Sequence, residues 1–444
     1  MNIRPKYHIA PLRGWINDPN GLVKYKGQYH VFYQHHPYDT KWGPMHWGHV
    51  VSEDLLHWKH LPIALTPGDE FDKDGCFSGT SLVVGDRLYV FYTGFIYNEN
   101  PELIKQQQCL AYTDDGITFH KLGLIIGEDN LPKGYAPNDF RDPSVYKEDD
   151  HYVMLVAVRK LDGRGNILKY VSKDLRKWDF VSEILSKDSD GIMIECPDYV
   201  KDLRLLINCE QFQPVEEYLH HNLHSNYYRI GEFKNEKFVV EKTGMIDYGF
   251  DFYAPQMFSN EYIMVAWMDM WDRDNPSEVE GFAGSLTIPR RVKVEDGELL
   301  QTPIIPQEIE KEEVVKNQYV EHCKVGFYKI ETNNFSKFSL KIRKGQSHET
   351  LFSLNGDKWV FDRSCSGKVI KGKETDKDSL NGIRIMPYHQ KEQHEIYIIL
   401  DEFSVEIFVD GYSLTSLIYP EKTDDVFELN CDASYCKLTK YKNS

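Results

Sequence analysis

A repeat of about 60 residues constrains the fold of this 444-residue chain more than any other feature. The segment SEDLLHWKHL, which contains Trp58, recurs as TDDGITFHKL with Phe119 and as SKDLRKWDFV with Trp178. Weaker copies contain Phe238 and Leu299, so successive markers are 59–61 residues apart. Each unit is long enough for four short strands. Five copies therefore predict a five-bladed β-propeller.

Each unit also has a polar or small-residue head, a strand, a tight turn and a second strand. The five heads lie at Asn17, Phe77, Arg141, Glu195 and Tyr253. Because the first strand of every propeller blade lines the central axis, these heads are expected to meet at one end of it. Three heads carry a carboxyl group, at Asp18, Asp142 and Glu195. The sequence thus predicts one axial pocket with three carboxylates.

The repeat stops near residue 300, which divides the chain. Residues 1–303 are expected to form the propeller, and the charged residues 304–317 are expected to form a helical linker. In residues 318–444, alternating strands such as FSLKIRK return without the repeat, which indicates a β-sandwich. The predicted fold class is all-β, a five-bladed β-propeller followed by a C-terminal antiparallel β-sandwich.

Composition excludes several classes of function. The net charge of −17 argues against nucleic acid as a partner, because phosphate binding needs basic stripes. No segment has the roughly 20 continuous apolar residues that span a membrane, and the N-terminal residues lack a secretory apolar run, so we expect a cytoplasmic protein. The eight scattered cysteines favour reduced thiols and leave disulfides open, and no metal or other cofactor is expected. Nothing in the sequence specifies an oligomeric state.

Paired carboxylates favour glycoside hydrolysis, which uses one carboxyl group on each side of the scissile bond. A single acidic residue beside a proline is more often a turn residue. Three acidic heads at equivalent blade positions make a catalytic site the better interpretation.

Several motifs then resemble one family. GWINDPNGL at residues 14–22 resembles the nucleophile motif of glycoside hydrolase family 32, which holds invertases, inulinases, levanases and sucrose-6-phosphate hydrolases. RDP at 141–143 and ECP at 195–197 match the other two carboxylate motifs in order and spacing. Further similar stretches are WGPMHWGH at 42–49, FSG at 77–79, DFYAPQ at 251–256 and LTIPR at 286–290. With DRSCSG and DEFSVEIFVDG in the tail, the resemblance covers nearly the whole chain.

The resemblance implies a retaining β-fructofuranosidase that hydrolyses sucrose or sucrose-6-phosphate through a covalent fructosyl intermediate, with a small saccharide as its partner. Asp18 would be the nucleophile and Glu195 the general acid, then the general base. Asp142 would hold sugar hydroxyls and stabilise the oxocarbenium-like transition state. The fructose-binding positions that match are Asn17, Gln34, Trp42, Phe77, Ser78, Arg141 and Trp267.

Hairpin pairing and charge add three expectations about this pocket. Counting back from the turn at residues 260–261 places Ala254 opposite Trp267, and so brings the following loop to the pocket. Asp18 is expected to be ionised, and Glu195 to be kept protonated by burial and a neighbouring negative charge. The cations of residues 159–164 (Arg159, Lys160 and Arg164) are predicted to bind a substrate phosphate at the rim.

Two alternatives stay open. Residues 208–226 are unlike the usual short strand and loop, and Ile194 stands where many members of the family have Trp. These departures concern the leaving-group side, so hydrolysis of short inulin- or levan-type fructooligosaccharides, or fructosyl transfer, is the first alternative. A non-catalytic carbohydrate-binding propeller is the second, and the presence of all three carboxylates argues against it.

Overall fold

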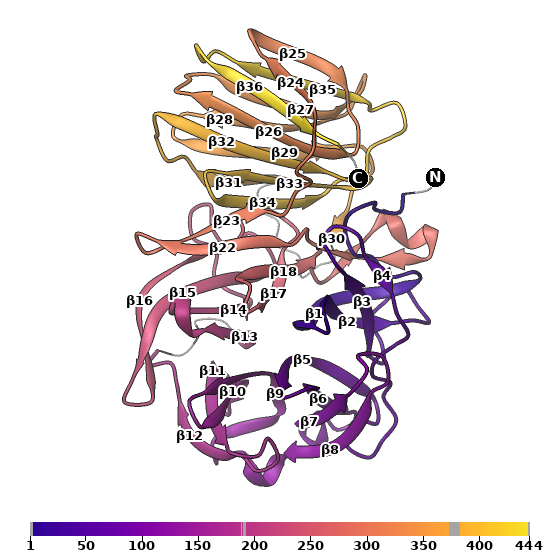
Figure 1. Cartoon of the computed structure of the whole chain (residues 1–444), viewed down its shortest axis with the longest axis vertical. Coiled ribbons are helices and arrows are strands. Elements are labelled where there is room, and N and C mark those ends of the chain that lie inside the picture. The colour runs from indigo at the N-terminus through magenta and orange to yellow at the C-terminus, as the bar shows by residue number, and fades with distance from the viewer. Residues whose placement is uncertain (1–2, 188, 190–191, 373–381, 443–444) are drawn as a thin grey trace.

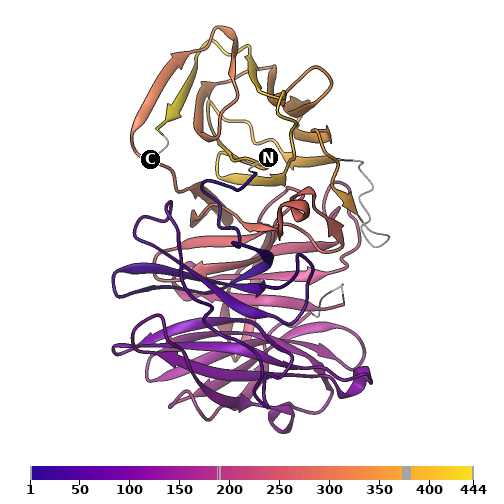
Figure 2. The same cartoon turned by 90° about the vertical axis from the view of Figure 1, so that its right-hand side faces the viewer.

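The computed structural model describes residues 3–187, 189, 192–372 and 382–442. It consists of two β domains, one stacked on the other (Figure 1, Figure 2). Five sheets surround an axis in the first domain, and two six-stranded sheets form the second. The predicted propeller and sandwich are confirmed.

The five propeller sheets follow one another along the chain. The first contains β1 (Gly14–Tyr25), β2 (Gln28–His36), β3 (His46–Ser52), β4 (Lys59–His60) and β20 (Phe282–Ala283). The second contains β5 (Gly75–Val84), β6 (Arg87–Ile96), β7 (Lys105–Thr113) and β8 (His120–Ile126). The third contains β9 (Tyr135–Glu148), β10 (His151–Lys160), β11 (Gly165–Ser172) and β12 (Asp179–Glu183). The fourth contains β13 (Ile194–Val200), β14 (Leu205–Gln211), β15 (His224–Lys234) and β16 (Lys237–Met245). The fifth contains β17 (Tyr253–Phe258), β18 (Ile263–Met268), β21 (Ser285–Leu286), β22 (Arg290–Glu295) and β23 (Glu298–Pro303).

The first strands β1, β5, β9, β13 and β17 lie innermost and contact their neighbours around the ring (Figure 1). Polar side chains tie them together across the axis. Ser144 of β9 donates to Asp198 of β13 over 2.9 Å, and Gln256 of β17 donates to a β5 carbonyl over 3.1 Å. The parallel pairing of β20 with β1 joins the last part of the propeller to the first sheet. These contacts fix the relative positions of the five heads.

The sandwich buries an apolar core between its two sheets, with Phe352 and Trp359 stacked at 4.8 Å near the middle. One sheet contains β24 (Ile309–Val314), β26 (Gly326–Asn333), β32 (Gln393–Leu400), β33 (Ser404–Val409), β34 (Tyr412–Leu417) and β36 (Cys436–Tyr441). The other contains β25 (Asn317–His322), β27 (Phe338–Lys344), β28 (Glu349–Asn355), β29 (Lys358–Cys365), β31 (Ile383–Pro387) and β35 (Val426–Cys431). A separate ribbon pairs β19 (Arg273–Asp274) with β30 (Lys371–Gly372).

Helices are few and short. They are the 3₁₀ turns η1 (Pro101–Leu103), η2 (Glu128–Asn130), η3 (Lys201–Leu203) and η4 (Pro276–Glu280). Over the described ranges, therefore, no helix has the length and apolar character needed to cross a membrane.

The helical linker predicted for residues 304–317 is wrong, because residues 309–314 form strand β24. This strand pairs with β36 at the edge of a sandwich sheet, and its side chains are mostly exposed. Lys437 on β36 pairs with Glu312 at 3.2 Å. Charged side chains are a usual protection of an exposed sheet edge. Without knowledge of the partner strand, the same charged sequence is also compatible with a solvent-exposed helix.

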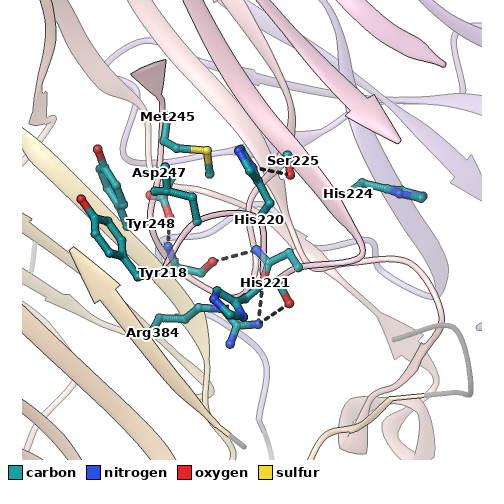
Figure 3. A pocket seen from close by; sticks show the side chains of 12 residues that line it. Tyr218, His220, His221, His224, Ser225, Met245, Asp247, Tyr248 and Arg384 are labelled. Atoms are coloured by element: carbon teal, nitrogen blue, oxygen red, sulfur yellow. Dashed lines mark hydrogen bonds between the residues drawn. The ribbon is translucent and has the colours of Figure 1, made fainter. Parts of the chain in front are cut away.

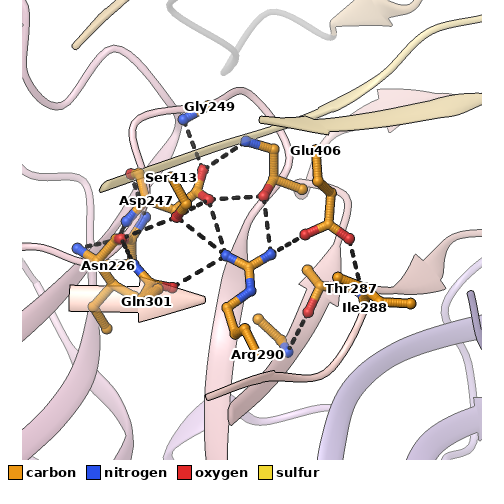
Figure 4. Close-up of polar contacts among 12 residues, drawn as sticks. Asn226, Asp247, Gly249, Thr287, Ile288, Arg290, Gln301, Glu406 and Ser413 are labelled. Carbon is orange, nitrogen blue, oxygen red and sulfur yellow. Dashed lines mark hydrogen bonds and ion pairs between the residues drawn. The ribbon is translucent and has the colours of Figure 1, made fainter. Parts of the chain in front are cut away.

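A buried polar network joins the two domains at Arg290 of β22 (Figure 4). The guanidinium forms ion pairs with Asp247 and with Glu406 of β33, and all three side chains are fully buried. It also donates to Ser413 over 3.1 Å and to Thr415 over 3.2 Å, both on β34. One cation thus compensates carboxylates from both domains.

Replacing Arg290 with Met is expected to lower the free energy of unfolding by ~3–5 kcal/mol, because the buried Asp247 would lose its ion pair and the buried Glu406 would be left with His8 as its cation. Arg291→Met is the matched control, since Arg291 is exposed on the same strand. We expect the control to change stability by less than about 0.5 kcal/mol. Denaturant unfolding of both variants measures the difference, and equal stabilities would contradict the role given to this network.

Candidate active site

The first strand of every propeller sheet carries a β-bulge near its head. In β1 the pairing with β2 shifts between Ile16 and Pro19, and similar shifts occur near the heads of β5, β9, β13 and β17. Three bulged residues have a positive φ, Asp142 at 63°, Cys196 at 50° and Ala254 at 47°. Because a bulge bends the strand and re-aims its side chains, it explains how the heads turn toward the axis.

A cavity of about 450 Å³ lies among these heads. Its wall includes Asp18, Asp142 and Glu195, which lie far apart in the sequence. Six further predicted residues line it, namely Asn17, Gln34, Trp42, Phe77, Ser78 and Arg141. The sequence placed the three carboxylates at equivalent blade positions, but in β13 the bulged residue before proline is Cys196, and Glu195 precedes it.

Asp18 lines the cavity from β1 and is buried. Its carboxylate accepts a hydrogen bond from the Ser78 hydroxyl over 2.6 Å and from the Asn17 amide over 3.1 Å. The Trp15 indole donates to Asn17 over 2.7 Å and so orients that amide. Burial raises the pKa of Asp18 and the charge of Glu195 raises it further, against the lowering effect of Ser78.

Asp142 of β9 and Asp18 of β1 both contact the Cys196 thiol, which lies 3.5 Å from Asp18 and 3.6 Å from Asp142. The Cys196 backbone N–H donates to Asp142 over 2.9 Å. Burial raises the pKa of Asp142 to about 7; the charge of Arg141 opposes this rise, and the negative charges of Glu195 and Asp18 add to it. A group with this pKa holds a proton in part of the molecules at neutral pH.

Glu195 is held from two sides. Arg141 donates to its Oε1 from Nη2 over 2.9 Å and from Nε over 3.2 Å, and the Tyr253 hydroxyl donates to Oε2 over 2.5 Å. Burial raises the pKa of Glu195, but Arg141, His224 and Tyr253 together outweigh burial and lower it.

The expectation that Glu195 is protonated is therefore wrong for the free protein. The residues next to Glu195 in the sequence indicate burial and a nearby negative charge, but the guanidinium that binds Glu195 belongs to Arg141, 54 residues away in the chain. An ion pair favours the charged form of a carboxyl group. Among the three carboxyl groups, protonation is therefore favoured at Asp18 and Asp142 over Glu195.

Trp267, predicted to bind fructose, does not line the cavity. It is fully buried behind the wall, against Trp15 at 5.7 Å and Trp271 at 5.1 Å. The bulge at Ala254 shifts the register so that Tyr253, not Ala254, lies opposite Trp267. A shift of one residue moves a side chain to the other face of a strand. Trp271, from the loop after β18, occupies the cavity wall instead.

Four more lining residues were not singled out from the sequence, namely Phe95, Gln106, Asp139 and Gln211. Trp271 lies in the loop that the hairpin pairing had placed at the pocket, and Gln211 lies within residues 208–226, which differ from the usual family pattern. Phe95 and Gln106 gave no signal in a single sequence. Phe95 stacks on Phe77 at 4.4 Å and Trp42 meets Phe77 edge-on at 5.8 Å, so one wall is aromatic.

The loop of residues 212–223 between β14 and β15 is anchored by the sandwich (Figure 3). Arg384 of β31 donates to the His221 carbonyl over 3.1 Å and to the Asn222 amide oxygen over 2.7 Å. Asn222 in turn donates to the Gly249 carbonyl over 2.8 Å. His224, at the start of β15, points away from these side chains, and its ring lies 5.5 Å from that of Tyr253.

The three cations predicted to bind phosphate do not form one cluster. Lys160 pairs with Glu183 at 2.9 Å and Arg164 with Asp162 at 2.6 Å. Arg159 donates to Asp139 over 2.6 Å. Arg159 is thus the member of this group whose partner lines the cavity.

Comparison with known families agrees with this geometry. The model of the glycosyl hydrolases family 32 N-terminal domain matches residues 8–303, and that of the family 32 C-terminal domain matches residues 296–439. The chain belongs to glycoside hydrolase family 32. It is accordingly a glycoside hydrolase, and the resemblance seen in its motifs is confirmed.

Curated relatives and solved structures of this family align over most of their length. A sucrose-6-phosphate hydrolase of Zymomonas mobilis is 37% identical over 94% of this chain and 87% of the relative. A raffinose invertase of Escherichia coli is 36% identical over 94% of this chain and 90% of the relative. The structure of sucrose-6-phosphate hydrolase from Lactobacillus gasseri superimposes with a TM-score of 0.90 at 27% identity, over 100% of this chain and 93% of that one. A Bombyx mori β-fructofuranosidase in complex with sucrose gives 0.84 at 28% identity, over 99% and 93%.

Proposed function

We propose that this family 32 enzyme is a retaining β-fructofuranosidase that hydrolyses sucrose or sucrose-6-phosphate, with Asp18 as nucleophile and Glu195 as acid and base. The observation that carries the proposal is the meeting of Asp18, Asp142 and Glu195 on one cavity wall, with donors fixed on each carboxylate. The relatives named sucrose-6-phosphate hydrolase and raffinose invertase support the choice of substrate.

The reaction proceeds in two displacements. The Asp18 carboxylate attacks the anomeric carbon of the fructosyl unit while the bond to the leaving oxygen breaks, and Glu195 gives that oxygen its proton. Glu195, now ionised, takes a proton from water, whose oxygen attacks the same carbon and releases Asp18. One water is consumed and two sugars are formed, with the configuration of fructose retained.

The charges of the free site indicate what substrate binding has to change. Glu195 needs a proton and Asp18 needs to lose one, whereas the surroundings lower the pKa of Glu195 and raise that of Asp18. A sugar hydroxyl that accepts a hydrogen bond from Arg141 weakens its pairing with Glu195, and a hydroxyl that donates to Asp18 or Asp142 favours the ionised form of those groups. Binding of the fructosyl unit thereby moves the proton to the group that uses it.

The test of this function is the identity and configuration of the first product. With sucrose, we expect ¹H NMR at early times to show β-fructofuranose before mutarotation, because two displacements restore the starting configuration. Initial appearance of the α-anomer would exclude Asp18 as a nucleophile. If none of sucrose, sucrose-6-phosphate, 1-kestose and inulin released fructose, the proposed function as a whole would be wrong.

The relative rates of hydrolysis of the same four substrates identify the leaving group that the enzyme prefers. Rates that favour sucrose and sucrose-6-phosphate over 1-kestose and inulin fit the proposal, and the reverse order fits an oligofructosidase.

We also propose a cytoplasmic location, which the eight free thiols support, since disulfides are rare in reducing compartments.

A further inference from the structure

A continuous series of ion pairs runs from the rim of the cavity to Glu195. Arg159 of β10 donates from Nε to one oxygen of Asp139 over 2.6 Å, and Arg141 donates from Nη1 to the other oxygen over 2.7 Å. The remaining two donors of Arg141 both bind Glu195. Asp139 lines the cavity, whereas Arg159 does not. The charges alternate along this series, so Asp139 influences Glu195 through Arg141, and Arg159 influences it through Asp139.

The guanidinium of Arg141 has little freedom to move alone. Its Nη1 also donates to Gln106 over 3.1 Å, and its side chain is only 11% exposed. Asp139 is therefore the anion that holds the outer side of Arg141, just as Glu195 holds the inner side. A change in the charge of Asp139 alters both the position of Arg141 and the field it exerts.

Other charged and titratable groups also face Glu195, from each strand packed around it. They are Asp18 of β1, Asp142 of β9, Cys196 of β13, Cys209 of β14, His224 of β15 and Tyr253 of β17. In the described part of the chain, the hydrogen bonds and ion pairs of Asp139 join it to Arg141 and Arg159, and those of Arg159 join it to Asp139. None of them involves the six groups that face Glu195. The outer two groups can therefore be changed while the inner set keeps its own contacts.

We propose that Asp139 and Arg159 are positioning residues that set how strongly Arg141 acts on Glu195, and so control the acid/base step of the proposed fructosidase from the rim of the cavity. This rests on the proposed function for the role of Glu195. Asp139 offsets the positive charge of Arg141, and Arg159 offsets Asp139. Removing the charge of Asp139 and removing that of Arg159 therefore shift the protonation of Glu195 in opposite directions.

The sign of each effect follows from the charge removed. In Asp139→Asn the charge of Arg141 acts unopposed, which favours ionised Glu195 and lowers its pKa. In Arg159→Gln the charge of Asp139 is no longer offset and draws Arg141 outward, which favours the protonated form and raises that pKa. A single charge roughly 8–12 Å away shifts a pKa by about 1–1.5 units at an effective dielectric constant near 20.

The experiment is the pH profile of kcat/KM for sucrose, whose acidic limb reports Glu195, because Glu195 has the lower pKa in the free enzyme and Asp18 and Asp142 the higher ones. We expect this limb to move to lower pH in Asp139→Asn, to higher pH in Arg159→Gln, and back toward the wild-type position in the double variant. Arg87→Gln is the charge-matched control, because Arg87 at the start of β6 pairs with Asp114 and both side chains are exposed. Its limb should move by less than about 0.2 unit.

Shifts of the same sign in the two variants, or shifts no larger than that of the control, would overturn the inference while leaving the function intact. A merely structural role would lower activity without moving the limbs in opposite directions. The ¹³C resonance of the Glu195 carboxyl, assigned by its loss in Glu195→Gln, gives the same titration without turnover. It decides the inference even if the wild type released no fructose and the proposed function failed.

Discussion

Replacing Asp18 with Asn is expected to abolish the hydrolysis of every fructoside, with kcat reduced by about 10⁴-fold or more. The amide has nearly the shape of the carboxylate but cannot form the covalent fructosyl intermediate. The other carboxylates on the cavity wall are each held elsewhere: Asp142 by the Cys196 backbone, Glu195 by Arg141, and Asp139 by Arg141 and Arg159. None of the three is therefore placed to take over the attack.

The fold of this variant should remain intact, which separates lost chemistry from lost structure. Because burial raises the pKa of Asp18, its ionised form costs stability at neutral and higher pH. The neutral Asn removes that cost, so the melting temperature should be equal to or higher than that of the wild type. Asp150→Asn, at an exposed position of the β9–β10 turn, is the control for the change of charge and should keep full activity. More than a few per cent of residual turnover in Asp18→Asn would exclude Asp18 as the nucleophile.

Replacing Glu195 with Gln is expected to lower kcat/KM for sucrose by on the order of 10²–10⁴-fold, the usual contribution of a general acid. The loss should be at least about tenfold smaller for β-fructofuranosyl fluoride, because fluoride leaves without protonation. Gln keeps the size of the side chain and an oxygen that accepts from Arg141, so the site should keep its shape. Initial rates on both substrates give the comparison.

The two steps of the reaction separate the two roles of Glu195. With the fluoride, formation of the intermediate stays fast while its hydrolysis lacks the base, so a burst of fluoride release should precede a slow steady state. Equal losses of kcat/KM on both substrates would remove Glu195 from the acid role. A fast steady state on the fluoride would remove it from the base role.

Much of this architecture can be predicted from a local sequence pattern that is repeated along the chain. A marker every 59–61 residues needs no knowledge of long-range contacts, because each unit forms its own four-stranded sheet and the copies add up to a ring. The ring then determines that the heads of the first strands meet. For that reason Asp18, Asp142 and Glu195 were placed on one wall, with six of the seven predicted binding residues.

The errors lie where a partner distant in the chain decides the outcome. The charges of residues 309–314 are compatible with a helix until β36 supplies a strand to pair with. Trp267 is on the pocket side of an ideal hairpin, but the bulge at Ala254 changes the register by one residue.

The sequence by itself determined the fold class, the ring and the set of carboxylates, because each follows from the spacing and chemistry of residues within one repeat. Only the tertiary structure decided the protonation of that set. The pKa of Glu195 depends on Arg141 from β9 and Tyr253 from β17, and that of Asp18 on Ser78 from β5. Electrostatic energies depend on distances of a few ångströms and on burial, and both are fixed only when the five sheets close around the axis.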